Sequence, residues 1–143
     1  MRLYLDTSAL VKLYVEEEGS ALVRESVRQA EMVATSAIAY VEARAALSRR
    51  RRERYLSPSN YRRTIQEFNA DWQHYVSVEV TDSLIRKAAE LAQAHALRAY
   101  DAIHLASARL LRERLAEKML FSSWDANLLA AARREGLEAV QRK

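Results

Sequence analysis

The scarcity of glycine and proline is the feature that most restricts the fold of this chain. Only two glycines and one proline occur among its 143 residues, so it has few of the residues that long irregular loops use. Helices joined by short connections must therefore dominate. The same scarcity excludes a glycine-rich phosphate loop, a dinucleotide-binding fingerprint and the nucleophile elbow of the α/β-hydrolases.

Short apolar runs recur between segments of helical periodicity and indicate buried strands. They lie at residues 3–5, 32–34, 75–80 and 119–121, with an edge strand expected at 137–140. Helices are predicted after the capping residues Asp6, Gly19, Thr35–Ser36, Ser57, Thr81 and Asp125, the first including Leu10, Leu13 and Tyr14, and another from about Tyr100 to Glu113. Strands that alternate with helices imply an α/β fold with a mostly parallel sheet covered on both faces. The length suits one domain.

Two residue types that often carry chemistry are excluded here or uninformative. The chain has no cysteine, which excludes disulfide scaffolds, thiolate zinc sites and cysteine nucleophiles. Its three histidines, His74, His95 and His104, fall in separate predicted elements and lack the i, i+4 spacing of a zinc protease. We therefore interpret them as structural.

The charge balance and the N-terminus suggest a compartment and a partner. Asp6 stands where a signal peptide needs an apolar run, and no stretch is long enough to span a bilayer, so we expect a cytoplasmic protein without a membrane partner. Basic residues exceed acidic ones by 23 to 19. Arginine dominates this excess and favours a nucleic-acid partner, with a solvated helical surface as the alternative.

Four carboxylates stand apart from the charge clusters elsewhere in the chain. Asp6 and Asp125 each follow an apolar strand, whereas Glu42 and Asp101 adjoin apolar helical segments. Ligands of open parallel sheets bind beyond the carboxyl ends of the strands, so the two aspartates that follow strands can face one crevice. Burying several carboxylates together is unfavourable unless a cation balances them, and an all-oxygen site suits Mg²⁺ or Mn²⁺. The pattern therefore indicates a divalent-metal site.

Each of these acids also has a structural alternative. The two aspartates that follow strands are good helix N-caps, and they stabilise a helix in that position without any metal. Glu42 and Asp101 fall where burial is predicted, and each can pair with an arginine such as Arg44 or Arg98. Spacing alone leaves the metal site and these structural roles both open.

Four segments, each built around one of these acids, occur in the order typical of a known family. They are Leu5–Tyr14, Ala39–Ala46, Tyr100–Ala108 and Ser123–Ala132. The chain thereby resembles the PIN-domain ribonucleases, and in particular the VapC toxins of type II toxin-antitoxin pairs, over nearly its whole length. Ser123 departs mildly from the last motif, which often has threonine there, but it keeps the hydroxyl. Ser8 and Ser123 are expected to support the site by hydrogen bonding.

The resemblance implies a fold and an activity. The fold is a PIN-like three-layer α/β/α sandwich, with residues 1–143 forming a single PIN domain. The activity is that of a metal-dependent endoribonuclease, in which water attacks an RNA phosphodiester and leaves 3′-hydroxyl and 5′-phosphate ends. Asp6 and Asp101 match the positions that most directly hold Mg²⁺ or Mn²⁺, whereas Glu42 and Asp125 match supporting or second-metal positions.

The resemblance also implies partners, namely RNA, a cognate VapB-type antitoxin and a second copy of the chain in a homodimer. Arg44, Arg49 and Arg50 are candidates for RNA contact because they follow Glu42 along the same predicted helix. Arginines in a continuous run cannot all face RNA, so contact with solvent or an acidic partner is the alternative for each. Two alternatives concern the whole chain: a catalytically silent PIN-fold module that binds RNA or antitoxin, and a DNA or flap nuclease.

Overall fold

Five parallel strands form one sheet in the computed structural model, which describes residues 1–140. The strands are β1 (Arg2–Leu5), β2 (Met32–Ser36), β3 (Val76–Val78), β4 (Met119–Ser122) and β5 (Glu138–Ala139). Their order across the sheet is β3-β2-β1-β4-β5, so the first strand of the chain lies at the centre. Every adjacent pair is parallel. The predicted α/β fold with a mostly parallel sheet is therefore confirmed.

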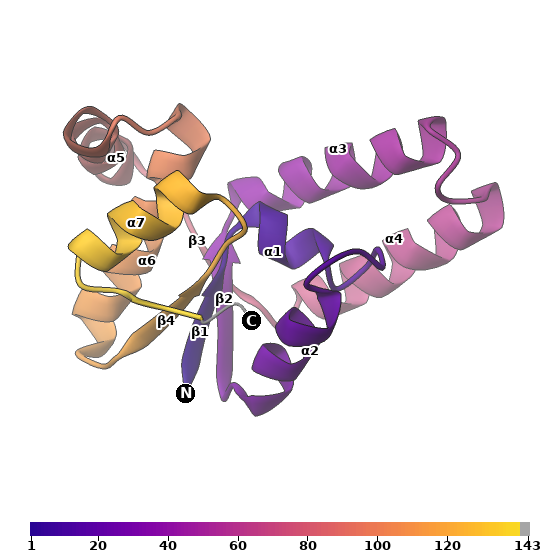
Figure 1. Ribbon diagram of the computed structural model, residues 1–143, viewed down its shortest axis with the longest axis horizontal. Helices are drawn as coiled ribbons and strands as arrows, with labels where there is room; N and C mark the ends of the chain where they lie inside the picture. Colours follow the sequence, from indigo (N-terminus) through magenta and orange to yellow (C-terminus); the bar gives the residue numbers. More distant parts are fainter. Residues whose placement is uncertain (141–143) are drawn as a thin grey trace.

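Helices cover both faces of this sheet, which gives the three layers of the sandwich (Figure 1). They are α1 (Thr7–Val11), α2 (Ser20–Gln29), α3 (Ile38–Arg52), α4 (Pro58–Trp72), α5 (Asp82–His95), α6 (Ala99–Leu115) and α7 (Ala126–Arg134). Helices α5, α6 and α7 pack on one face, and α1 to α4 pack on the other. None of the helices within residues 1–140 has the length and hydropathy that a bilayer span requires.

The central strand β1 joins two hydrophobic cores because its side chains alternate between the faces of the sheet. Leu3 and Leu5 pack against the layer of α1 to α4, whereas Tyr4 packs into the layer of α5 to α7. All three side chains are fully buried. Burying a leucine side chain contributes about 1.5–3 kcal/mol. Packing in both cores therefore fixes the position of the carboxyl end of β1.

Helices α3 and α4 run side by side and extend beyond the sheet as a hairpin (Figure 1). Aromatic rings hold the base of this hairpin together. The ring of Phe68, which is fully buried, lies 5.4 Å from that of Tyr40 and 5.7 Å from that of Trp72. Such pairs add about 0.5–1.5 kcal/mol beyond the area they bury. The hairpin is thus anchored to the core of α1 to α4, which also includes Leu47 in the second half of α3.

Some local predictions differ from the structure. The first helix ends at Val11 instead of continuing through Tyr14, and residues 12–15 form turns. Thr35 and Ser36 belong to β2, because the Thr35 hydroxyl donates to the carbonyl of Leu5 on the neighbouring strand at 2.7 Å. A contact between strands thus replaces local capping at Thr35, whereas the Ser36 hydroxyl still accepts a hydrogen bond from the amide of Ile38, the first residue of α3, at 3.2 Å.

Candidate metal centre

The carboxyl ends of β1 and β4 lie side by side and place two of the predicted acids. The strands pair in parallel up to Leu5 and Ser122, and the amide of Asp6 continues the pairing by donating to the carbonyl of Ser122 at 3.2 Å. Asp6 then caps α1 and Asp125 caps α7 through their side chains. Both aspartates therefore have the capping role that the sequence offered as an alternative, and that role also directs them to one edge of the sheet.

Asp6 is the most buried acid of the group, with 3% of its surface exposed. Its Oδ1 accepts hydrogen bonds from the Ser8 hydroxyl at 2.7 Å and the Ala9 amide at 3.0 Å. Its Oδ2 accepts from the Ser123 hydroxyl at 2.6 Å. Burial raises the pKa of Asp6, and nearby His104 and these hydrogen bonds offset only part of that effect. The predicted supporting serines thus contact the first acid directly.

Glu42 projects from α3 toward the same edge of the sheet. Its Oε1 accepts from the Thr7 hydroxyl at 2.6 Å and from Nε2 of His104 at 3.0 Å. Burial raises the pKa of Glu42, but the hydrogen bonds from His104 and Thr7 outweigh that effect and hold it below its ordinary value. Arg44, a partner that the sequence allowed for Glu42, donates instead to the hydroxyl of Tyr40 at 3.0 Å. Glu42 is therefore held as a carboxylate without an arginine.

Asp101 and Asp125 share one arginine. Nε of Arg98 donates to Oδ2 of Asp101 at 3.0 Å, and Nη2 of Arg98 donates to Oδ2 of Asp125 at 3.1 Å. The Arg98 side chain is 78% exposed, so solvent screens both contacts. The sequence had offered this arginine as a partner for Asp101, and the structure confirms that pairing. The two acids are thus bridged by a cation at the surface.

The four predicted acids line one cavity of about 320 Å³. Its walls are formed by Asp6, Thr7, Ser8, Glu42, Arg98, Asp101, His104, Trp124 and Asp125. The end of β1, α3, α6 and the start of α7 each contribute one acid. As the side chains lie, no three acids or histidines within residues 1–140 form a group that could hold a metal ion. The fold thus brings four carboxylates, which are oxygen ligands of the kind that Mg²⁺ and Mn²⁺ prefer, to one cavity, and Arg98 bridges two of them.

His104 is the main residue of this cavity that the sequence interpretation missed. It is 2% exposed, which fits the structural role we expected, but its ring also contacts the Glu42 carboxylate. The signal was the spacing of three between Asp101 and His104, which places both on one side of a helix. Thr7 and Trp124, which also line the wall, adjoin predicted acids and serines in the sequence, whereas Arg98 was among the arginines that the sequence offered as partners of the acids.

Trp124 packs inward against the backbone of Gly19. A Cβ at Gly19 would lie 2.3 Å from Cζ2 of Trp124, and φ at this glycine is +93°. Nζ of Lys12 lies 4.8 Å above the tryptophan ring. The Trp124 amide also donates to the Ser8 hydroxyl at 3.0 Å. The ring thus contacts the start of α2 while also forming part of the cavity wall.

The three predicted RNA-binding arginines lie along α3, and none of them lines the cavity. Arg50 donates to Glu17 at 2.5 Å, and Arg49 lies 3.9 Å from Glu53. The Arg49 side chain is 73% exposed. These arginines are therefore positioned beside the acidic site along the hairpin and not within it.

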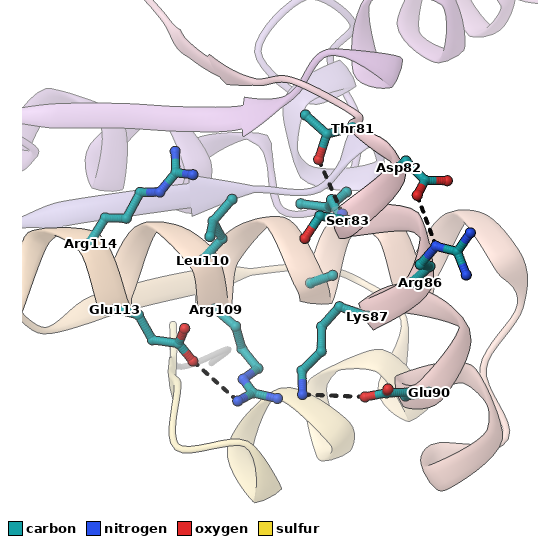
Figure 2. Close-up of a pocket in the computed structure, with 12 residues that line it drawn as sticks. Thr81, Asp82, Ser83, Arg86, Lys87, Glu90, Arg109, Leu110, Glu113 and Arg114 are labelled. Carbon is teal, nitrogen blue, oxygen red and sulfur yellow. Dashed lines mark hydrogen bonds and ion pairs between the residues drawn. The ribbon is translucent and has the colours of Figure 1, made fainter.

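A larger cavity of about 580 Å³ lies between α5 and α6 (Figure 2). Most of its charged side chains form ion pairs: Arg86 with Asp82 at 2.8 Å, Lys87 with Glu90 at 3.4 Å, and Arg109 with Glu113 at 3.2 Å and with Glu135 at 2.8 Å. None of the predicted site residues lines it. Paired charges at a surface need no ligand, so we assign the site to the smaller, acid-lined cavity.

Comparisons with known proteins agree with this geometry. The family model "PIN domain" matches residues 3–119, which include Asp6, Glu42 and Asp101. Ribonuclease VapC45 from Mycobacterium tuberculosis is 35% identical over 133 residues, which is 93% of this chain and 90% of that protein.

Solved structures share the fold at lower identity. A toxin-antitoxin complex from Klebsiella pneumoniae has a chain that is 18% identical, with a TM-score of 0.68 and coverage of 99% of this chain and 97% of that one. Mycobacterium tuberculosis VapC20, a sarcin-ricin loop cleaving toxin, is 18% identical, with a TM-score of 0.66 and coverage of 90% and 94%. The match to the family model and the 35% identity together show that this chain belongs to the PIN-domain family and, within it, to the VapC ribonucleases.

Proposed function

We propose that this chain is a metal-dependent endoribonuclease and the toxin of a type II toxin-antitoxin pair. One observation carries the proposal: Asp6, Glu42, Asp101 and Asp125, from four separate elements, line a single cavity. Its relative in Mycobacterium tuberculosis is named a ribonuclease, which supports RNA as the substrate. The RNA substrate and the antitoxin that would inhibit this protein are both expected in the cytoplasm.

The donor set fits a divalent cation such as Mg²⁺ or Mn²⁺. Asp6 is buried, and its three hydrogen-bond donors are uncharged groups, so a cation beside it would stabilise its charged form. Asp6 and Asp101 would hold the ion, while Glu42 and Asp125 would orient water or a second ion. The ion supplies Lewis acidity, which polarises a phosphoryl oxygen and makes water a better nucleophile at neutral pH.

Metal binding at this site requires Asp101 and Asp125 to exchange Arg98 for the ion. Exposed ion pairs are screened by solvent and contribute little, and the Arg98 side chain is 78% exposed. The exchange is therefore inexpensive. As they lie in the described residues, 1–140, these acids cannot hold an ion. The release of Arg98 is the step that would make them a metal site.

RNA binding needs positive charge near the cavity, because its acids repel phosphate. Residues 44–63 of the α3–α4 hairpin contain eight of the chain's 23 basic residues and one of its 19 acidic ones, so the rest of the chain holds 15 basic and 18 acidic residues. The excess of positive charge is thus confined to this hairpin. Arg49 is exposed and available to an RNA backbone, whereas Arg44 and Arg50 would first leave Tyr40 and Glu17.

The proposed protein partners are a VapB-type antitoxin and a second copy of the chain. A structural neighbour from Klebsiella pneumoniae is part of a toxin-antitoxin complex, and the bridge from Arg98 shows that the cavity rim accepts a guanidinium. An antitoxin arginine is therefore a suitable inhibitor. Tyr55, which is 70% exposed, is a candidate for contact with a partner, whereas Tyr14 and Tyr61 are partly buried against the core.

Cleavage of RNA by variants at the site tests the proposed function. Asp6→Asn and Asp101→Asn should each lower the rate of single-stranded RNA cleavage by more than about a hundredfold, because metal catalysis contributes several kcal/mol. Asp82→Asn is the matched control, since Asp82 also begins a helix but pairs with Arg86 at the surface. It should cleave at the wild-type rate.

Three outcomes would contradict the proposal. Cleavage that survives both aspartate substitutions would exclude the metal mechanism. RNA binding without cleavage in Mg²⁺ and in Mn²⁺ would identify a silent binding module. Preference for structured DNA over RNA would identify a DNA nuclease. Sequencing the product ends distinguishes the expected 3′-hydroxyl and 5′-phosphate from ends formed by attack of a ribose hydroxyl.

A further inference from the structure

A hydrogen-bonded chain of buried side chains runs from the core to the Glu42 carboxylate. The Tyr4 hydroxyl lies 2.8 Å from Nδ1 of His104, and Nε2 of the same ring lies 3.0 Å from Oε1 of Glu42. The Thr7 hydroxyl joins the chain, at 2.6 Å from Oε1 of Glu42 and 3.1 Å from Nε2 of His104. Tyr4 is fully buried and His104 is 2% exposed. Solvent therefore has little access to the inner end of this chain.

The donors and acceptors in this chain specify one tautomer of His104. A carboxylate only accepts hydrogen bonds, so Nε2 must carry the hydrogen that faces Glu42. A neutral ring then leaves Nδ1 as an acceptor for the Tyr4 hydroxyl. Tyr4 thus fixes the tautomer that donates to Glu42.

Glu42 needs such a support because its own helix gives it little. Val41 beside it on α3 is 65% exposed, so this part of the helix is open to solvent. Fixing a long and flexible glutamate side chain in one position costs rotamer entropy. The bonds from Thr7 and His104 both end on Oε1, which leaves Oε2 without a protein hydrogen bond within residues 1–140. One oxygen is anchored while the other remains available.

We propose that His104 is a positioning residue of the metal site. The Tyr4 hydroxyl fixes the tautomer of His104, and this tautomer holds the Glu42 carboxylate in place for the ion or its water. The inference rests on the proposed function, since Glu42 has a role only if the cavity binds metal. It assigns a functional role to a histidine whose burial alone indicates a core residue.

Two substitutions at His104 separate positioning from packing. His104→Gln places an amide N–H near the position of Nε2 and can still donate to Glu42, whereas His104→Asn is too short to do so. Loss of such an outer support typically lowers metal affinity or activity about 10- to 100-fold. We expect His104→Asn to show this loss in Mn²⁺ affinity by titration calorimetry and in kcat. His104→Gln should recover most of the affinity.

His95 provides a matched control, because it also forms a partly buried contact with a glutamate. Its Nε2 lies 2.7 Å from Oε2 of Glu135, and its side chain is 9% exposed. His95→Asn should lower the melting temperature without changing Mn²⁺ affinity. If His104→Asn likewise changes only the melting temperature, His104 is a packing residue and the proposal is wrong.

Tyr4→Phe tests the inner end of the chain without touching the cavity. In the metal-free wild type, ¹⁵N NMR of the imidazole should show the Nε2–H tautomer for His104, and Tyr4→Phe should reduce its population. Tyr4→Phe should also weaken Mn²⁺ binding by less than His104→Asn and add nothing to it in the double variant. The Nδ1–H tautomer in the wild type, or additive losses, would overturn the proposal. A wild type that binds no Mn²⁺ would instead refute the proposed function.

Discussion

Arg98 and Asp125 are 27 positions apart in the sequence, yet Nη2 of the arginine lies 3.1 Å from Oδ2 of the aspartate. The contact joins the N-cap residue of α6 to the N-cap residue of α7. Arg98 also binds Asp101 in the first turn of α6. One exposed guanidinium therefore pairs with both Asp101 and Asp125, whose side chains are 17% and 30% exposed, and it competes directly with any ion there.

Removing this competitor should strengthen metal binding. We predict that Arg98→Gln raises Mn²⁺ affinity roughly threefold, since exposed ion pairs are weak and the loss of one has a small effect. Titration calorimetry at fixed ionic strength measures the change. Arg86→Gln is the control, because Arg86 is also 78% exposed and pairs with Asp82 away from the cavity. Unchanged or weaker binding in Arg98→Gln would show that the bridge does not compete with the ion.

Two adjacent serines at the end of β4 should respond differently to truncation. The Ser123 hydroxyl donates to Asp6 at 2.6 Å and accepts from the Asp125 amide at 3.0 Å, whereas the buried Ser122 hydroxyl has no hydrogen-bond partner among residues 1–140. We predict that Ser123→Ala lowers metal affinity about 10-fold or more. Ser122→Ala should leave affinity unchanged and keep or raise stability, because it removes an unsatisfied buried hydroxyl.

Calorimetry and urea unfolding of the two serine variants test this contrast. The positions are neighbours on one strand end and are exposed by 1% for Ser122 and 2% for Ser123, so a general effect of truncation there would change both alike. Equal losses of metal affinity in the two variants would contradict a specific role for the Ser123 hydroxyl.

Metal binding should stabilise the folded protein. An ion at one hundred times its dissociation constant adds about 2.7 kcal/mol to the free energy of unfolding, which corresponds to a rise in melting temperature of about 5–10 °C for a chain of this size. We predict this shift with Mn²⁺ in the wild type and its loss in Asp6→Asn, measured by differential scanning calorimetry. Asp82→Asn should retain the shift, and a chelator should reverse it. A shift of equal size in Asp6→Asn would place the ion elsewhere.

Tyr14 and Tyr75, which pack against the core of α1 to α4, predict a loss of stability at alkaline pH. The Tyr14 hydroxyl donates to Asp71 at 2.8 Å and contacts the hydroxyl of Tyr75. Burial raises the pKa of Tyr75 from about 10 to about 12, and it raises the pKa of Tyr14 as well. A raised pKa in the folded state means that stability is fully present below about pH 10 and is lost as the pH rises toward 12.

Urea unfolding between pH 8 and pH 11.5 measures this loss. The free energy of unfolding should fall with pH above about 10, and Tyr75→Phe should make the fall less steep, since one fewer proton is released on unfolding. Tyr55, whose side chain is 70% exposed, provides the control. If Tyr55→Phe reduces the steepness as much as Tyr75→Phe does, the buried pair is not the cause.

Much of the fold could be predicted because the relevant signals are local. Apolar runs at residues 3–5, 32–34 and 119–121 became β1, β2 and β4, and the scarcity of glycine and proline indicated long helices. The order of strands in the sheet is not local. It depends on which cores the alternating side chains of β1 enter, and those cores form only when distant helices pack.

The sequence alone determined that Asp6, Glu42, Asp101 and Asp125 stand out, because each sits beside apolar residues that fix a strand end or a helix face. Only the tertiary structure decided how their charges are balanced. Arg98 bridges two of them and His104 holds a third, through contacts between residues 27 and 62 positions apart. Hydrogen bonds and ion pairs depend on distances of a few ångströms between side chains, and periodicity along a chain carries no information on such distances.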